Sequence, residues 1–315
     1  MLERPADAMR QYIDAVAAFE AWEEALKEAE QVRGGMYWHK GSGAGYLVRT
    51  SPAGSEKSLG PRSAQTEALY EAFQRRKEQA QVRLTGLKAA VAKHKRMNRA
   101  LRVGRVAPLI VQILRRLSEA RLGEHFRVVG THALYAYESV AGVAFDTEAV
   151  ATQDIDLLWD VRRRMAFATA LSRVDSSMLG VLRKVDTTFK VRNAQKYTAV
   201  NQDGFEVDII RRMKQEDDPH PIRLSDDEDD FWAAQAPRAQ ELLDAPGFSA
   251  VIVATDGDMA RMNTLDPIAF ARFKRWMSEL QDRDPLKRRR DALQAQLVET
   301  VVRDYLPHLT PPACD

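Results

Sequence analysis

Three short apolar segments between residues 128 and 210 decide the fold. They read Val128-Val129-Gly130-Thr131, Asp154-Ile155-Asp156-Leu157-Leu158 and Phe205-Glu206-Val207-Asp208-Ile209-Ile210. Runs of branched apolar residues of this length, bounded by turn residues, are typical of β-strands. The first segment runs into a glycine turn, and the other two carry aspartates. We therefore predict three strands, of which one leads into a turn and two present carboxylates.

The aspartates of the second segment are expected to lie on one face of its strand. Successive side chains of a strand point to opposite faces, so Asp154 and Asp156 project together while Ile155 points away. Asp208 lies between apolar residues in the third segment and could bring another carboxylate beside the first two. Clustered carboxylates repel one another, and Mg²⁺ or Mn²⁺ would neutralise them through oxygen ligands.

Such a cluster suits the transfer of a nucleotidyl group. Two divalent ions roughly 4 Å apart can activate an attacking hydroxyl and stabilise the leaving pyrophosphate in an in-line displacement. We expect Asp154 and Asp156 to hold both ions. Asp208 is expected to hold one ion and to accept the proton of the attacking hydroxyl.

The Gly130-Thr131 turn is the candidate phosphate site. A glycine between a strand and a helix lets a phosphate approach backbone N–H groups at the helix N-terminus, and Thr131 could add a hydroxyl donor. An ordinary strand-to-helix turn contains the same two residues, so the ordered set of the turn and three aspartates carries more weight than the turn alone. His132 follows the turn and could help to position a nucleotide, or it could be structural.

The order Gly130-Thr131, Asp154-x-Asp156, Asp208 resembles that of the DNA polymerase beta nucleotidyltransferase superfamily. More closely, the chain resembles an uncharacterised bacterial family of nucleotidyltransferase-fold proteins over most of its length. The matching segments are Lys57–Ser63, Val128–Glu138, Ala151–Leu158 and Arg283–Arg288. The resemblance implies a mixed-sheet catalytic fold, magnesium, and a nucleoside triphosphate donor such as ATP. The superfamily usually has Gly-Ser or Gly-Gly where this chain has Gly130-Thr131.

Lys274 is a candidate triphosphate ligand by the same resemblance. It lies on the helix expected after the second hairpin, where related folds carry a lysine that contacts the triphosphate. A compact ammonium group suits a phosphate, although a basic helix face would explain the same residue. Arg283, Lys287 and Arg288 could line an acceptor path or could be exposed residues of the last helix.

Patterning over the whole chain predicts an α+β protein with three regions. Residues 1–104 form an accessory unit with a helix over 6–32, a small β-meander with a glycine-rich turn at 41–45, and a long basic helix. Residues 105–215 form a mixed-sheet, polymerase beta-like nucleotidyltransferase core. Residues 216–315 form an acidic connector, a helix over 231–243, a hairpin and C-terminal helices. Asp266, followed by Pro267, is expected to cap one of those helices, and Asp284-Pro285 is expected to start the last one.

The composition narrows the class of protein. Of the 315 residues, 45% are apolar and 29% are charged, as in globular proteins, and the net charge is only +2. No apolar run reaches the length of a membrane span and no signal peptide is recognisable, so a cytoplasmic protein is expected. Cys314 is the only cysteine, which excludes a disulfide framework or a cysteine zinc site within one chain.

The acceptor of the transferred group is expected to be a nucleic-acid end. Basic residues from Arg83 to Arg105 could contact phosphates, and meander aromatics such as Tyr37 and Trp38 could stack on bases. A solvated helix face and a small aromatic core are the alternatives. A second hypothesis is transfer to a protein hydroxyl, its own or a target's, in a toxin or phage-defence role, with Tyr305 as one candidate acceptor. A third is a nucleic-acid-binding module without catalysis.

Overall fold

The computed structural model describes residues 1–40, 45–215 and 218–309, and its contacts divide the chain into two compact units. One unit is Arg10–Leu101, and the other combines Met1–Met9 with Arg102–Asp315. Most of the glycine-rich turn predicted at 41–45 lies outside the described residues, as do the first two residues of the predicted acidic connector.

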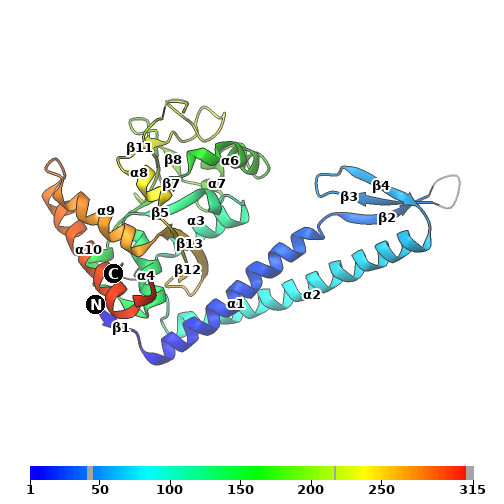
Figure 1. The fold of residues 1–315 in the computed structure, drawn as a ribbon, viewed down its shortest axis with the longest axis horizontal. Helices are drawn as coiled ribbons and strands as arrows, with labels where there is room; N and C mark the ends of the chain where they lie inside the picture. The colour runs from blue at the N-terminus through cyan, green and yellow to red at the C-terminus, as the bar shows by residue number, and fades with distance from the viewer. Residues whose placement is uncertain (41–44, 216–217, 310–315) are drawn as a thin grey trace, which may run out of the picture. The chain divides into compact units, whose positions relative to one another are not determined.

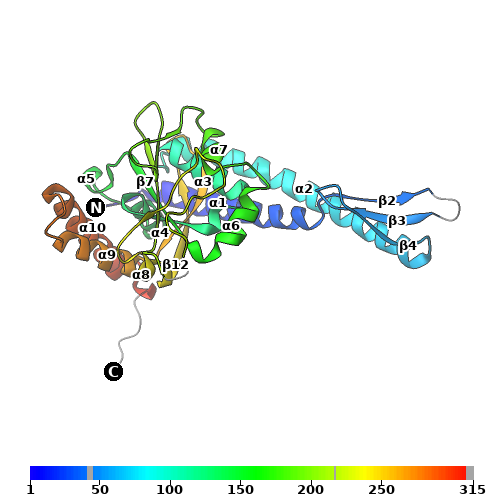
Figure 2. The same ribbon diagram turned by 90° about the horizontal axis from the view of Figure 1, so that it is seen from above.

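Two long helices and a small sheet make up the unit Arg10–Leu101 (Figures 1 and 2). The elements are α1 (Ala6–Gln31), β2 (Gly35–His39), β3 (Tyr46–Thr50), β4 (Glu56–Pro61) and α2 (Ala64–Ala100). The helices run antiparallel, since Gln11 Nε2 donates to Asn98 Oδ1 at 2.9 Å while Arg83 pairs with Glu28. The strands form an antiparallel sheet in the order β2-β3-β4. The predicted helix, meander and long helix are therefore confirmed.

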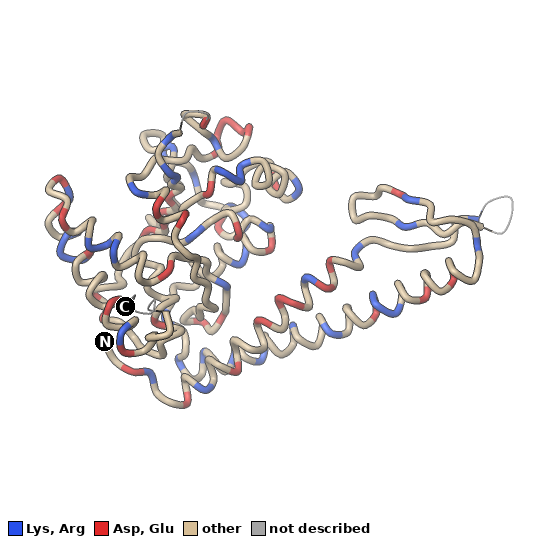
Figure 3. Tube along the Cα trace, in the orientation of Figure 1, with Lys and Arg blue, Asp and Glu red and all other residues tan. Residues whose placement is uncertain are grey.

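This unit has its own small core and a strongly charged surface. Phe73 of α2 is buried with Met36 and Leu47 of the sheet, so the meander packs on the helix through apolar side chains. Basic and acidic residues follow both helices along their length (Figure 3).

An eight-stranded mixed sheet forms the centre of the other unit. Its main path runs β12-β13-β5-β7-β10-β9-β8, and β11 pairs with β10. The strands are β5 (Phe126–Val129), β7 (Asp154–Trp159), β8 (Lys190–Val191), β9 (Thr198–Val200), β10 (Glu206–Arg211), β11 (Ala234–Gln235), β12 (Gly247–Val253) and β13 (Met259–Leu265). β7 pairs antiparallel with β5 and parallel with β10. The predicted mixed sheet is confirmed, and the C-terminal hairpin β12–β13 extends it by a parallel pairing with β5.

Helices pack on this sheet and on one another. Their bounds are α3 (Pro108–Glu119), α4 (Leu134–Ala141), α5 (Thr147–Val150), α6 (Arg164–Leu171), α7 (Met178–Arg183), α8 (Ala239–Asp244), α9 (Pro267–Glu279) and α10 (Pro285–Tyr305). A further pair of short strands is β1 (Leu2–Glu3) with β6 (Val143–Ala144), and single 3₁₀ turns precede β5, α4 and α6 and follow α10. α9 and α10 lie side by side, and α10 also contacts α4 and α5 (Figure 1).

The cap predicted at Asp266 and the helix start predicted at Asp284-Pro285 are confirmed. Asp266 accepts from the N–H groups of Ile268 and Ala269, and Asp284 accepts from those of Leu286 and Lys287. Each cap satisfies N–H groups that have no partner within the helix. The two helices therefore begin where the Asp-Pro pairs predict.

The helix predicted over 231–243 is wrong in its first half. Residues 234–235 form β11 on the edge of β10, and the helix α8 begins only at Ala239. Pro237 explains the difference, because proline lacks an N–H group and disfavours helical backbone in the residue before it. In the described parts of the chain, no helix combines the length and the apolar character that crossing a membrane requires.

Candidate active site

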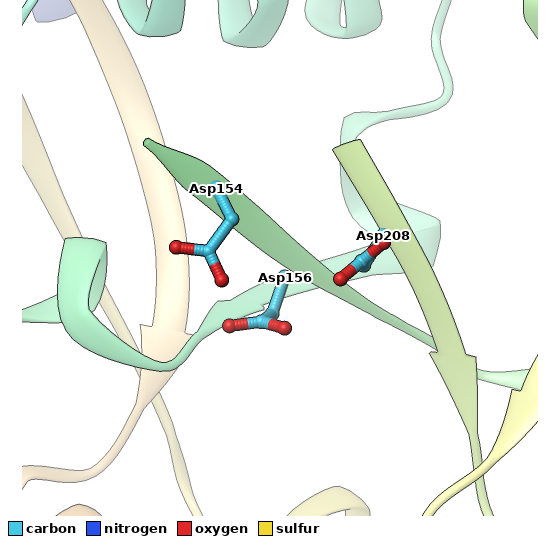
Figure 4. Close-up of side chains that lie close together, drawn as sticks. All are labelled: Asp154, Asp156 and Asp208. Atoms are coloured by element: carbon cyan, nitrogen blue, oxygen red, sulfur yellow. The ribbon is translucent and has the colours of Figure 1, made fainter. Parts of the chain in front are cut away.

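Three carboxylates meet on the face of the central sheet (Figure 4). In the parallel pair β7–β10, Asp156 lies directly opposite Asp208, and Asp154 lies opposite Glu206. One oxygen from each of Asp154, Asp156 and Asp208 lies within 4.8 Å of the others. The structure thus brings together the three aspartates that the sequence singled out.

The alternation of the strands explains this placement. Ile155, Leu157 and Val207 are fully buried in the apolar core on one side of the sheet. The aspartates between them must point to the other side, where they are only partly covered. One-sided burial therefore fixes the register that aligns the carboxylates, because a one-residue slip would place the aspartates in the apolar core.

The charges of the cluster are poorly compensated within the chain. Burial and the neighbouring charges of Asp154 and Asp208 raise the pKa of Asp156 to about 7, against a smaller opposing effect of Lys274 and Arg283. Burial also raises the pKa of Asp208, which the Thr198 hydroxyl opposes by donating to Asp208 Oδ1 at 2.5 Å. Three carboxylate oxygens whose negative charges repel one another fit a hard divalent cation such as Mg²⁺ or Mn²⁺.

Gly130 lies directly against this cluster. It follows β5, whose Val129 is paired with Asp156, and its φ of 72° is in the region that favours glycine. A Cβ atom at this position would lie 2.2 Å from Asp156 Oδ2. The site therefore requires glycine here both for backbone conformation and for the close approach of the carboxylate.

The two residues after Gly130 are buried. Thr131 Oγ1 accepts a hydrogen bond from Gln294 Nε2 of α10 at 3.1 Å. The His132 ring lies 5.8 Å from the Tyr135 ring and 6.4 Å from the Phe205 ring, between centroids. Burial lowers the pKa of His132 to about 4, and neither ring nitrogen has a hydrogen-bond partner among the described residues. His132 is therefore a neutral imidazole, and its role with a nucleotide stays a prediction.

Lys274 is held in a buried ion pair. Its Nζ atom lies 2.8 Å from Asp291 Oδ1 of α10, and Arg283 donates to the other oxygen of the same carboxylate. Burial lowers the pKa of Lys274, while the charges of Asp291 and Asp156 oppose that effect. The ammonium group of Lys274 is therefore paired with Asp291 and lies near enough to Asp156 to interact with its charge, and its contact with a triphosphate stays a prediction.

The other basic candidates of the last helix lie differently. Arg288 Nε donates to the backbone oxygen of Ser278 at 3.0 Å, so this side chain fastens α10 to the end of α9. Lys287 is exposed. Tyr305 donates to Glu3 at 3.2 Å at the opposite end of α10.

Several residues around the carboxylates did not emerge from the sequence. Glu206 lies opposite Asp154 and pairs with Arg192, and its position two residues before Asp208 could have indicated the shared face. Thr198, Asp291 and Gln294 gave no local signal. They reach the site from strands and helices whose packing the sequence pattern does not specify.

A family model described as Nucleotidyltransferase matches residues 109–313. This match covers the sheet with its carboxylates as well as α9 and α10. No curated protein and no solved structure shows significant similarity to the chain.

Proposed function

The chain belongs to this nucleotidyltransferase family, and from that premise we propose that it moves a nucleoside monophosphate from a nucleoside triphosphate to a hydroxyl acceptor. The single observation that carries the proposal is the convergence of Asp154, Asp156 and Asp208 within 4.8 Å. The mixed sheet supports a polymerase beta-like core. The reaction is a phosphoryl substitution with release of pyrophosphate, and its expected cofactor is Mg²⁺ or Mn²⁺.

The residues of the chain have distinct parts in the proposed reaction. Asp154 and Asp156 would hold the metal ions, and Asp208 would contribute a further oxygen ligand. Bound Mg²⁺ or Mn²⁺ would supply charge stabilisation for the attacking and leaving oxygens. The acceptor oxygen forms a bond to the α-phosphorus, the bond to the pyrophosphate oxygen breaks, and Asp208 accepts the proton of the acceptor hydroxyl.

Gly130 and Thr131 bind the triphosphate in this proposal. The missing Cβ of Gly130 lets backbone approach the carboxylates closely, so a phosphate bound at the turn would lie beside the metal ligands. Lys274 adds positive charge next to Asp156. Together these groups would hold the phosphates in line with the acceptor.

A nucleic-acid end is the proposed acceptor because of α2. Four basic residues in its C-terminal half are exposed: Lys88, Lys93, Arg96 and Arg99. Within the described residues none of these four makes an ion pair, so their charges are available for phosphates. The meander offers less support. Trp38 packs against Tyr70, and Arg49 donates to backbone oxygens of Gly35, Thr50 and Arg33.

Transfer to a protein hydroxyl is the second candidate, but Tyr305 is a poor acceptor in its own chain. Its hydroxyl donates to Glu3. It also lies 11 residues beyond Gln294, which contacts the Thr131 turn, and that spacing corresponds to about 17 Å along a helix. A separate acceptor molecule agrees better with this distance.

One assay distinguishes these possibilities. The full chain is incubated with each labelled ribo- or deoxyribonucleoside triphosphate, Mg²⁺ or Mn²⁺, and RNA or DNA. Label is then followed into nucleic acid, protein and small products. We expect label in nucleic acid with the wild type and with Asp226→Ala, an exposed control. Asp154→Ala and Asp156→Ala should abolish it.

Three other outcomes carry different conclusions. Label transfer that survives both substitutions contradicts the carboxylate mechanism. Label on protein alone favours the second acceptor. Nucleic-acid binding without transfer to any acceptor favours a non-catalytic module.

A further inference from the structure

Gln294 connects the last helix to both halves of the site. Its side chain is fully buried on α10. The amide nitrogen Nε2 donates to the backbone oxygen of Ala149 at 2.7 Å and to Thr131 Oγ1 at 3.1 Å. Ala149 belongs to α5, which leads into the strand with Asp154 and Asp156, while Thr131 belongs to the glycine turn. One amide group therefore spans the segment of the carboxylates and the candidate phosphate turn.

The contact with Ala149 fixes the orientation of the amide. A backbone carbonyl can only accept a hydrogen bond, so the NH₂ group of Gln294 must face it. The reverse orientation would place two oxygen atoms 2.7 Å apart. Because the NH₂ group also lies against Thr131 Oγ1, the threonine hydroxyl must be the acceptor in that bond.

This geometry leaves the proton of the Thr131 hydroxyl for another partner. A hydroxyl has one proton and two acceptor lone pairs, and Gln294 occupies one lone pair. Within the described residues the Thr131 hydroxyl donates to no protein acceptor. A threonine in a helical turn commonly donates to a preceding backbone carbonyl, and no such bond is present at Thr131.

The residue that carries this hydroxyl adjoins the glycine that lies against the carboxylate cluster. Thr131 directly follows Gly130, whose Cα lies so close to Asp156 that a Cβ atom would be 2.2 Å from Oδ2. A donor beside three metal-binding carboxylates is complementary to a phosphate oxygen, because that oxygen can bind the metal ions and accept a hydrogen bond.

We propose that Gln294 is a positioning residue, which holds the Thr131 hydroxyl as a hydrogen-bond donor to a phosphate of the nucleotide. This inference rests on the proposed function, because its ligand is the nucleoside triphosphate. Gln294 does not contact the nucleotide. It acts through Thr131 and through the spacing between the turn and the strand β7.

Measuring the unfolding free energy and the kinetics of the same Gln294 variant distinguishes a positioning role from a purely structural one. Gln294 Oε1 is buried and has no partner among the described residues. Replacing Gln294 by methionine removes two hydrogen bonds but also removes that unsatisfied acceptor and keeps the volume. The substitution also leaves the buried Ala149 carbonyl oxygen without its Gln294 donor, so the urea midpoint should fall, and the orientation of the Thr131 hydroxyl is lost.

The test measures KM for the nucleoside triphosphate, kcat and the urea midpoint for the full chain with Mg²⁺. The variants are Gln294→Met, Thr131→Val, their combination, and Gln296→Met as an exposed control on the same helix. We expect Gln294→Met and Thr131→Val each to raise KM about tenfold, the scale of one hydrogen bond to a charged group, with smaller effects on kcat. The double variant should have the KM of Thr131→Val. Gln296→Met should stay close to wild type in KM and in urea midpoint, and the kinetics of Gln294→Met are measured without urea, where the variant is folded.

Two results would overturn the inference while the proposed function stands. One is an unchanged KM for Gln294→Met in an active enzyme. The other is multiplication of the two effects in the double variant, which means that Gln294 acts independently of Thr131. If Gln294→Met does not fold, Gln294→Asn replaces it, because the shorter amide cannot reach both partners. A wild type that neither transfers nor binds a nucleotide would remove the proposed function together with this inference.

Discussion

Asp291 and the three sheet aspartates lie in the same unit, but the chain compensates their negative charges to different extents. Asp291 is fully buried, and the chain neutralises it with Lys274 at 2.8 Å and with Arg283. On the sheet, Asp154, Asp156 and Asp208 lie within 4.8 Å of one another, and burial with mutual repulsion raises the pKa of Asp156 to about 7. The same lysine and arginine only partly offset this repulsion.

The difference shows which carboxylates lack sufficient positive partners within the chain and would need a bound cation. A buried charge with its own partners is a structural element, and its removal should weaken the fold. A group of charges without sufficient partners costs free energy in the metal-free chain and is expected at a functional site. The contrast predicts that the two groups respond oppositely to mutation, to divalent ions and to pH.

The largest expected effect is on catalysis. Asp156→Asn removes a metal ligand at the centre of the cluster, so nucleotidyl transfer should fall by about three orders of magnitude, as when a charge contact of the transition state is lost. The free energy of unfolding in EDTA should instead rise, because the substitution removes a destabilising charge. Activity assays and urea unfolding at pH 8 measure both. A metal-free variant less stable than wild type would contradict the comparison.

Asp291→Ala should have the opposite effect on stability and lower the free energy of unfolding. It leaves Lys274 and Arg283 without their shared carboxylate, and the loss should be about 3–5 kcal/mol of unfolding free energy. The combination Lys274→Met/Asp291→Leu should recover part of that loss, because it removes the buried unpaired lysine and leaves only Arg283, which is partly exposed, without its carboxylate. Urea unfolding of the single and double variants provides the measurement. Equal stability of Asp291→Ala and wild type would show that the pair is not structural.

Divalent ions should stabilise the fold by binding to the three sheet aspartates and not to Asp291. Mg²⁺ or Mn²⁺ at a hundred times its dissociation constant should add about 2.7 kcal/mol to the unfolding free energy of the wild type. The gain should disappear with EDTA and in Asp154→Ala, and it should persist in the exposed control Asp226→Ala. An identical gain in Asp154→Ala would place the ion elsewhere.

The metal-free wild type should also lose stability relative to Asp156→Asn as the pH rises. The pKa of Asp156 is about 7 in the folded chain, against 3.8 for the free side chain. A raised folded pKa means that the folded state retains the proton longer, so its stabilising contribution is complete below pH 3.8 and is lost by about pH 7. Urea unfolding in EDTA at several pH values measures this difference. A difference that does not change with pH would refute the assignment of the raised pKa to Asp156.

The two groups also differ in how far the sequence could predict them. The alternation around Ile155 and Val207 placed Asp154, Asp156 and Asp208 on strand faces, because strand periodicity is a local property. Whether the three side chains lie close together depends on the register of β7 with β10, which the positions of the aspartates suggest but do not specify.

Asp291 gave no signal because its partners lie on another helix and on the connecting turn. Gln294 gave none either, since it meets Thr131 across 163 residues of sequence. Both contacts depend on how α10 packs, and apolar periodicity predicts only that one face of the helix is buried. The family resemblance named Lys274, but the sequence could not predict that Asp291 would hold it.

The smallest expected effect concerns the hydrogen bond between Thr198 and Asp208. Thr198 donates to Asp208 Oδ1 at 2.5 Å, and this bond lowers the pKa of Asp208 against the effect of burial. Thr198→Val keeps the shape and removes the hydroxyl, so the pKa of Asp208 should rise further. Because Asp208 must be ionised to accept the proton, the acid limb of kcat/KM should move to higher pH. The matched control is Thr169→Val, whose hydroxyl donates to the Met165 backbone oxygen on α6, and its profile should equal that of wild type. An unshifted limb in Thr198→Val would mean that ionisation of Asp208 does not limit the reaction in acid.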